Sequence, residues 1–219
     1  PKASDYDPKT CLILNTTIYL YHVLLLTDNS FPEAHVELEY AKEAWDMSSK
    51  YHKSTDITLD AGLVSLITTR SSNLRGEFKS KAQAIVTTAY GFELSDATAV
   101  KENNRERVTE LKSKSELHPC RAGIYQHKAI QQIINEVLFK NKGDEGIKWM
   151  EYYNPFPRVG FALMLMAIEC AIDEWSTGKR ELIHFKEDMY KCVFNQHLKM
   201  LDYFHQQTSK MDILPKMLQ

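Results

Sequence analysis

Two carboxylates at the end of an apolar segment are the residues best spaced for acid–base chemistry. Glu169 and Asp173 follow the apolar run from Val159 to Ile168 and lie four residues apart, so they share one face of a helix. Like charges at that spacing, near a helix C-terminus, are mildly destabilising, and a cation of another segment, such as an arginine, is expected to compensate them. The alternatives are a structural ion pair, a solvated helix end, and a catalytic or metal-binding pair. The Glu-x-x-His pattern of di-metal helical bundles is absent, because Ile172 stands three residues after Glu169.

A basic segment offers a second kind of chemistry, the binding of phosphates or base edges. The segment runs from Arg70 to Lys81 and has one anion, with hydroxyls and an amide between its charges. Its four cations are Arg70, Arg75, Lys79 and Lys81. Arginine and lysine at a helix N-terminus can bind phosphate, and arginine can contact base edges. Leu74 and Phe78, however, place one face of the same helix in the core. The segment therefore predicts a contact with nucleic acid, a contact with an acidic protein segment, or only the solvated side of a core helix.

Aromatic side chains gather in a third segment, around a loop rich in proline and asparagine. They are Trp149, Tyr152, Tyr153 and Phe156. Aromatic residues of this kind anchor protein interfaces when they are exposed. They are equally typical of a lid over a hydrophobic core, and the sequence leaves both interpretations open.

The histidines and cysteines show no spacing that predicts a metal site or an activated nucleophile. His118 and His127 flank Cys120, an arrangement that matches no recognised zinc spacing. Phosphate loops, nucleophile elbows and dinucleotide-binding fingerprints are absent. The four cysteines form no Cys-x-x-Cys pair and are expected to be reduced thiols of an intracellular protein, in the nucleus or the cytoplasm. We expect no cofactor, no metal and no catalytic residue.

Composition is ordinary for a globular protein and gives no global attraction to nucleic acid or membranes. The chain has 219 residues, 43% of them hydrophobic and 26% charged, and its formal net charge is −2. No segment reaches the roughly 18–20 uninterrupted apolar residues that a membrane span needs. We therefore expect no membrane partner.

Helical spacing recurs along almost the whole chain and predicts an all-α protein. The clearest case runs from Ile130 to Leu138, where apolar residues recur at i, i+3, i+4, i+7 and i+8. We expect a single compact domain over residues 1–219, with seven to nine helices around a central buried helix at about 157–176. Residues 93–120 are highly charged and balanced, which is typical of a solvated helix or a partly mobile connection.

Seven segments, in order along the chain, match one known pattern. They are Phe31-Pro32, Arg70–Ala82, Tyr90–Phe92, Gly123–Phe139, Asn154–Pro157, Ala167–Gly178 and His197–Leu201. Together they resemble an uncharacterised α-helical domain of basidiomycete, mushroom-forming fungi, catalogued as a domain of unknown function. The resemblance implies a helical domain often carried at the end of longer proteins, and it brings no activity, cofactor or catalytic residue.

These observations favour a non-catalytic helical interaction module, acting by self-association or by docking a protein partner. It is expected to be part of a larger fungal regulatory or chromatin-associated protein. An acidic face at residues 33–46 and the basic face at residues 70–81 can pair across a self-complementary interface. The first alternative is a nucleic-acid-binding domain that uses residues 70–81. The second is an enzyme with a carboxylate site at Glu169 and Asp173.

Overall fold

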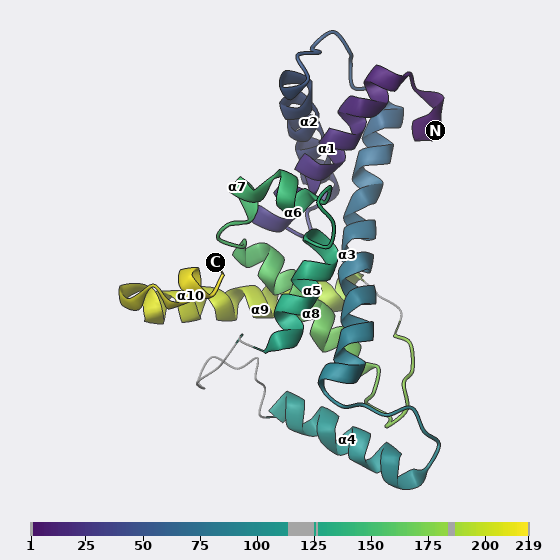
Figure 1. Ribbon diagram of the computed structural model, residues 1–219, viewed down its shortest axis with the longest axis vertical. Helices are drawn as coiled ribbons and strands as arrows, with labels where there is room; N and C mark the ends of the chain where they lie inside the picture. The colour runs from purple at the N-terminus through teal and green to yellow at the C-terminus, as the bar shows by residue number, and fades with distance from the viewer. Residues whose placement is uncertain (1, 114–124, 126, 184–186, 219) are drawn as a thin grey trace. The chain divides into compact units, whose positions relative to one another are not determined.

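The computed structural model describes residues 2–113, 125, 127–183 and 187–218, and every regular element in these ranges is a helix. The all-α prediction is confirmed (Figure 1). The α-helices are α1 (Pro8–Thr27), α2 (Ala34–Tyr51), α3 (Ala61–Ala89), α4 (Thr98–Ser113), α5 (Lys128–Leu138), α6 (Glu145–Lys148), α7 (Met150–Tyr153), α8 (Arg158–Asp173), α9 (Glu187–Thr208) and α10 (Ile213–Met217). Helices α6, α7 and α10 have four or five residues each. Such short helices leave no periodic pattern, which is why the sequence predicts only seven to nine.

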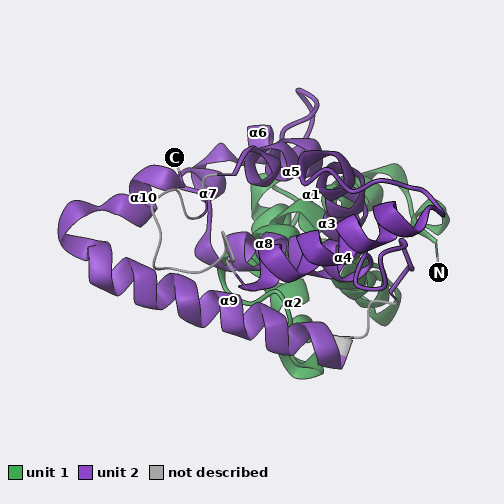
Figure 2. Ribbon diagram, turned by 90° about the horizontal axis from the view of Figure 1, so that it is seen from below, with its two compact units in different colours: residues 1–75 green, residues 76–219 purple. Residues whose placement is uncertain are grey.

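The chain divides into two compact units, residues 1–75 and residues 76–219 (Figure 2). The boundary falls inside α3, so one continuous helix contributes to both units. Each unit has buried apolar residues of its own. The single domain over residues 1–219 stays a prediction.

In the first unit, α1 packs against α2. Asp7 begins α1, because its carboxylate accepts hydrogen bonds from the backbone N–H groups of Lys9 and Thr10. Ser48 of α2 donates to the carbonyl oxygen of Ile13 at 2.8 Å, which fixes the two helices at their closest approach. Of the described helices, α1 is long and apolar enough to cross a membrane, and half of its most apolar window is buried. A core helix of a soluble protein passes the same test, so the absence of a membrane partner stays an expectation.

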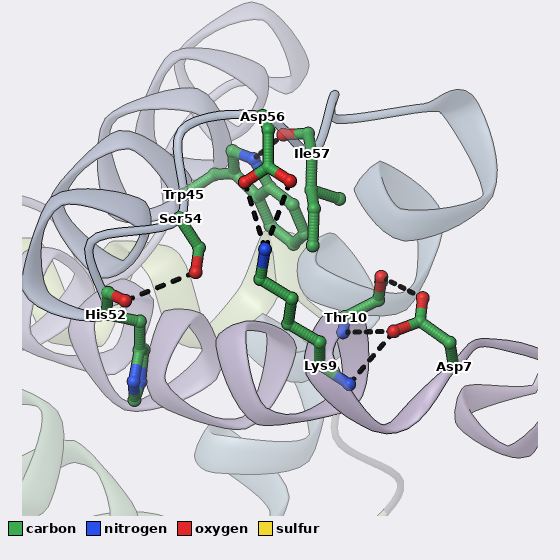
Figure 3. A network of polar contacts seen from close by, with 8 residues as sticks. All are labelled: Asp7, Lys9, Thr10, Trp45, His52, Ser54, Asp56 and Ile57. Atoms are coloured by element: carbon green, nitrogen blue, oxygen red, sulfur yellow. Dashed lines mark hydrogen bonds and ion pairs between the residues drawn. The ribbon is translucent and has the colours of Figure 1, made fainter.

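The loop after α2 is held to this helix pair by polar contacts (Figure 3). Lys9 forms an ion pair with Asp56 at 3.0 Å, and the indole of Trp45 donates to the carbonyl oxygen of Ile57 at 3.4 Å. Both charged side chains of the pair are more than half exposed, at 51% and 70%. A pair so exposed to water contributes at most about 1 kcal/mol, so it orders the loop rather than stabilising the unit.

In the second unit, α8 is the buried helix that the sequence predicts. Every residue from Val159 to Ile168 is buried, and so is every residue from Cys170 to Ile172. The helix contacts α9 on one side and α5 on another (Figure 1). A helix that is apolar on nearly all sides can be stable only inside a core. This explains why α8 is the central element of its unit.

The described part of the charged segment forms α4, which is mostly solvated. Only Asn104 and Val108 of this helix are buried. The Asn104 amide donates to the carbonyl oxygens of Glu93 and Gly178, at 2.9 and 3.0 Å. The segment is therefore a solvated helix tied to its unit through residue 113, and residues 114–120 lie outside the described residues.

Candidate functional site

The two carboxylates predicted at the end of α8 each meet a histidine or lysine side chain of another helix. The His197 Nε2–H group of α9 donates to Glu169 at 2.8 Å, and Lys112 of α4 pairs with Asp173. The hydrogen bond from His197 lowers the pKa of Glu169 below its ordinary value, against the opposing effect of burial. The partners are thus a histidine and a lysine, where the sequence suggests an arginine. The two contacts link α8 to α9 and to α4.

The most buried acid of this region is Glu174, which sequence reasoning missed. Its side chain is 0% exposed and accepts from the Gln83 amide at 2.6 Å and from the Arg180 Nε–H group at 3.3 Å. Lys79 lies 3.6 Å from the same carboxylate. The one sequence signal is that Glu174 directly follows the apolar helix, beside Trp175, which is also buried. Glu174 is therefore the acid that depends most on its partners.

The basic segment does not present its four cations to solvent, which corrects the expectation of a basic face at residues 70–81. Arg75 is buried, donates to the carbonyl oxygen of Ser30 at 2.9 Å, and lies 4.9 Å from the centre of the Phe31 ring. Lys79 has only 13% of its side chain exposed. Arg70 is half-buried, and Lys81 is half-buried and pairs with Glu136 at 3.4 Å. Arg75 and Lys79 are long enough to turn back onto carbonyl and carboxylate oxygens within their own units.

The four aromatic residues of the third segment divide into two pairs. Trp149 and Tyr152 are half-buried, and their ring centres lie 6.5 Å apart. Tyr153 and Phe156 are buried, and their rings stack at 6.4 Å. The second pair lines a pocket. That Trp149 and Tyr152 anchor an interface stays a prediction.

This pocket, called the aromatic pocket below, has a volume of about 710 Å³ and lies wholly within the second unit. Such a volume is within the usual range for ligand sites. Its aromatic lining is Tyr125, Phe139, Tyr153, Phe156 and Phe161, and its aliphatic lining is Ile130, Ile134, Ile213, Met217 and Leu218. Its polar lining is His127, Lys128, Gln131, Asn135 and Lys216. Among these described residues none is acidic, so the pocket is apolar within and cationic at its exposed lysines.

Helix α5 supplies one wall of the aromatic pocket. His127 begins the helix, because its ring nitrogen accepts from the backbone N–H group of Ala129 at 3.3 Å. The same ring stacks on Tyr90 at 4.6 Å, which fixes the start of the helix. Gln131 and Asn135, joined by a 2.9 Å hydrogen bond, are exposed lining residues on the next two turns.

Two tyrosine hydroxyl groups of the lining are buried without a hydrogen-bond partner among the described residues. They belong to Tyr125 and Tyr153, which are 4% and 3% exposed. Burial raises the pKa of Tyr125 to about 12; burial and then the nearby Glu145 raise the pKa of Tyr153 well above its ordinary value. Both phenols are therefore neutral donors at physiological pH. A buried hydroxyl with no partner costs about 1–3 kcal/mol, so both tyrosines are held in place by their apolar packing.

The opposite wall is the C-terminal segment, residues 213–218. The backbone N–H group of Phe156 donates to the carbonyl oxygen of Leu218 at 2.7 Å. Leu214 and Leu218 are buried, at 1% and 8% exposure, and Ile213 and Met217 line the pocket. A short peptide segment thus lies along the aromatic wall and is held by one backbone hydrogen bond and by apolar side chains.

Comparison with known proteins identifies the family. Residues 16–204 match a family described as Domain of unknown function (DUF6532). The chain belongs to this family. No curated protein and no solved structure matches the chain. The DUF6532 match contains Tyr125 and the walls from α5, α7 and α8, whereas α10 and Leu218 lie beyond it.

The described part of this DUF6532 chain offers no metal centre. Among the residues whose positions the structure gives, no three His, Cys, Asp or Glu side chains are placed to hold a metal ion. Cys120 and His118 lie outside the described residues. What the arrangement can do is bind an apolar segment or molecule in the aromatic pocket.

Proposed function

We propose that this chain is a non-catalytic helical interaction module that docks a short apolar segment of a protein partner in the aromatic pocket. The observation that carries the proposal is the chain's own segment at residues 213–218, which lies on the pocket's wall as a peptide ligand would. The Phe156 N–H group donates a backbone hydrogen bond to it, and its own residues Leu214 and Leu218 are buried. The occupant is therefore argued to be a peptide rather than a small molecule.

The chemistry of the lining supports an apolar peptide. Aromatic side chains lose little conformational freedom on binding and give a large contact area, which is why they anchor protein interfaces. Two leucine-sized side chains would contribute about 3–6 kcal/mol of gross burial. Even before the cost of association, this burial alone corresponds to dissociation constants of only about 6 mM to about 40 μM, so further contacts of the peptide have to offset that cost.

The alternative functions draw less support from the geometry. Binding of nucleic acid through residues 70–81 would need Arg75 and Lys79, whose charged groups are engaged inside their units. The same engagement removes the basic half of the proposed pairing between an acidic and a basic face. Acid catalysis at Glu169 would need a raised pKa, and the pKa of this residue is lowered.

A peptide-display experiment tests the proposal. The full chain is immobilised and used to select from a library of random ten-residue peptides. Gln131→Trp places a bulky side chain at the exposed rim of the pocket, and the matched control Gln132→Trp makes the same change at an exposed neighbour that does not line it. We expect apolar peptides to be enriched by the wild type and by Gln132→Trp, and lost with Gln131→Trp.

Two results would contradict the proposal. One is a selection in which no sequence is enriched over a blank surface. The other is a set of enriched sequences that bind Gln131→Trp as tightly as they bind Gln132→Trp, because these peptides would then dock elsewhere.

We further propose that the chain comes from a basidiomycete fungus and acts inside the cell, in the nucleus or the cytoplasm, within a larger regulatory or chromatin-associated protein. The ordered segments from Phe31-Pro32 to His197–Leu201 support the origin. Fluorescence microscopy of the tagged full-length gene product tests the location. A product found outside the cell would contradict it.

A further inference from the structure

The C-terminal segment has the sequence pattern of a groove-binding peptide. Its apolar residues stand at i, i+1, i+4 and i+5: Ile213, Leu214, Met217 and Leu218. At helical spacing these positions form one face, and Lys216 on the other face is exposed. Pro215 lies in the first turn of α10, where a missing N–H group is tolerated. The segment is thus an amphipathic turn of helix that presents its apolar face to the pocket.

Such a segment is held almost entirely by the contacts that it makes. A helix of five residues has no stability of its own in water, because helix nucleation is costly and few internal hydrogen bonds follow it. Asp212, which joins it to the rest of the chain, has a φ angle of 50° in the left-handed region, a mildly unfavourable conformation for a residue with a side chain. Its contacts are those of the buried Leu214 and Leu218, its packing against α9 and the backbone hydrogen bond from Phe156. Release of residues 213–218 would break these contacts but none of the internal hydrogen bonds of α5 or α8.

We infer that residues 213–218 are a displaceable wall of the aromatic pocket, and that a partner segment with the same i, i+1, i+4, i+5 apolar pattern binds by taking their place. This inference rests on the proposed function. It also gives the interaction a built-in control, because a partner must compete with a tethered segment at high effective concentration. The apparent affinity of the intact chain is lowered by the fraction of molecules in which the pocket is open.

The test uses the full chain and a fluorescent peptide copy of residues 209–218. Leu214→Asp in the chain places a charge at a 1% exposed position and is expected to detach the segment. The matched control is Met211→Asp, which makes the same kind of change nearby at a position that is 68% exposed. Fluorescence anisotropy should show the peptide binding Leu214→Asp at least ten-fold more tightly than the wild type or Met211→Asp. A peptide that itself carries Leu214→Asp should not bind any of them.

A second measurement uses the wild-type chain and does not depend on the fold of a variant. Hydrogen exchange is followed with and without saturating peptide. We expect the amide of Phe156 to stay protected, because the peptide replaces the acceptor that Leu218 supplies. The amides of residues 216–218 of the chain should exchange faster as the segment is released.

The outcomes separate this inference from the proposed function. Two results would overturn the inference that residues 213–218 are displaced by a partner. They are equal affinity of the peptide for the wild type and for folded Leu214→Asp, and unchanged exchange of residues 216–218 on binding. Library-selected peptides that depend on Gln131 would then still support the docking function. Failure of every peptide to bind any folded chain would overturn both.

Discussion

Neutralising Glu174 is expected to destabilise the second unit more than any exposed charge change. The side chain of Glu174 is 0% exposed, and its carboxylate faces Lys79 at 3.6 Å and Arg180 at 3.3 Å. The side chains of these two cations are only 13% and 28% exposed, so water compensates them poorly once the acid is gone. Breaking a buried pair by removing one partner costs about 3–5 kcal/mol. Glu174→Gln keeps the shape of the side chain, so we expect about 3 kcal/mol, the lower end of that range.

Urea denaturation is the suitable assay, because urea does not screen charge as a guanidinium salt does. The loss should be seen in the midpoint of the transition and in faster hydrogen exchange of the α8 amides. The control is Glu102→Gln, which removes an i,i+3 pair with Arg105 at a side chain that is 59% exposed. An exposed pair contributes about 0.2–1 kcal/mol, so the control should change the free energy of unfolding by less than that amount.

A double-mutant cycle with Lys79→Met isolates the pair itself. Contacting residues show interaction free energies of about 0.5–3 kcal/mol, whereas independent residues add. Strict additivity of Glu174→Gln and Lys79→Met would refute the argument. So would a Glu174→Gln loss no larger than that of the Glu102→Gln control, since the buried acid would then not depend on its partners.

Three further changes have expected outcomes. Glu169→Gln should lower the free energy of unfolding near neutral pH. Because the pKa of Glu169 is lowered in the folded protein, the difference from the wild type should shrink as the pH falls below about 4.5. A difference that stays constant in urea titrations across that pH range would contradict this. Gly178→Ala should destabilise by more than about 1 kcal/mol, because φ is +86° and a Cβ atom would lie 2.4 Å from the Lys101 carbonyl oxygen; an unchanged melting temperature would count against the geometry. Gly76→Ala, inside α3 with no atom within 4 Å of the new Cβ, should stabilise by about 0.5–1 kcal/mol in the same melting experiment, and a loss of stability would show that the glycine has another role.

Local pattern was enough to predict the long helices, but not the short helices α6, α7 and α10. The spacing of Ile130, Ile133, Ile134 and Leu138 predicts α5, and the same four residues are buried. The unbroken apolar run after Val159 predicts that α8 is buried on nearly all sides, and the structure buries every residue from Val159 to Ile168. Both predictions succeed because a helix turns every 3.6 residues, so the side chains that face the core can be found from spacing alone.

The candidate site was predictable only in part. Tyr153 and Phe156 stand out in the sequence as members of an aromatic segment, but nothing there separates them from Trp149 and Tyr152, which reach the surface. The opposite wall at residues 213–218 leaves no long periodic pattern because α10 has only five residues. The hydrogen bond from the Phe156 N–H group to the Leu218 carbonyl oxygen joins two positions that are distant in the sequence, beyond the reach of any local rule.

The sequence by itself determined the class of the protein, its buried central helix and the need for cations near Glu169 and Asp173. Only the tertiary structure decided which groups meet those needs: His197 and Lys112 for the two acids, and Lys79 and Arg180 for Glu174. The physical reason is the difference in range. Helix formation depends on neighbours within one or two turns, whereas the partner of a buried charge depends on which helix faces pack together, and that is a property of the whole unit.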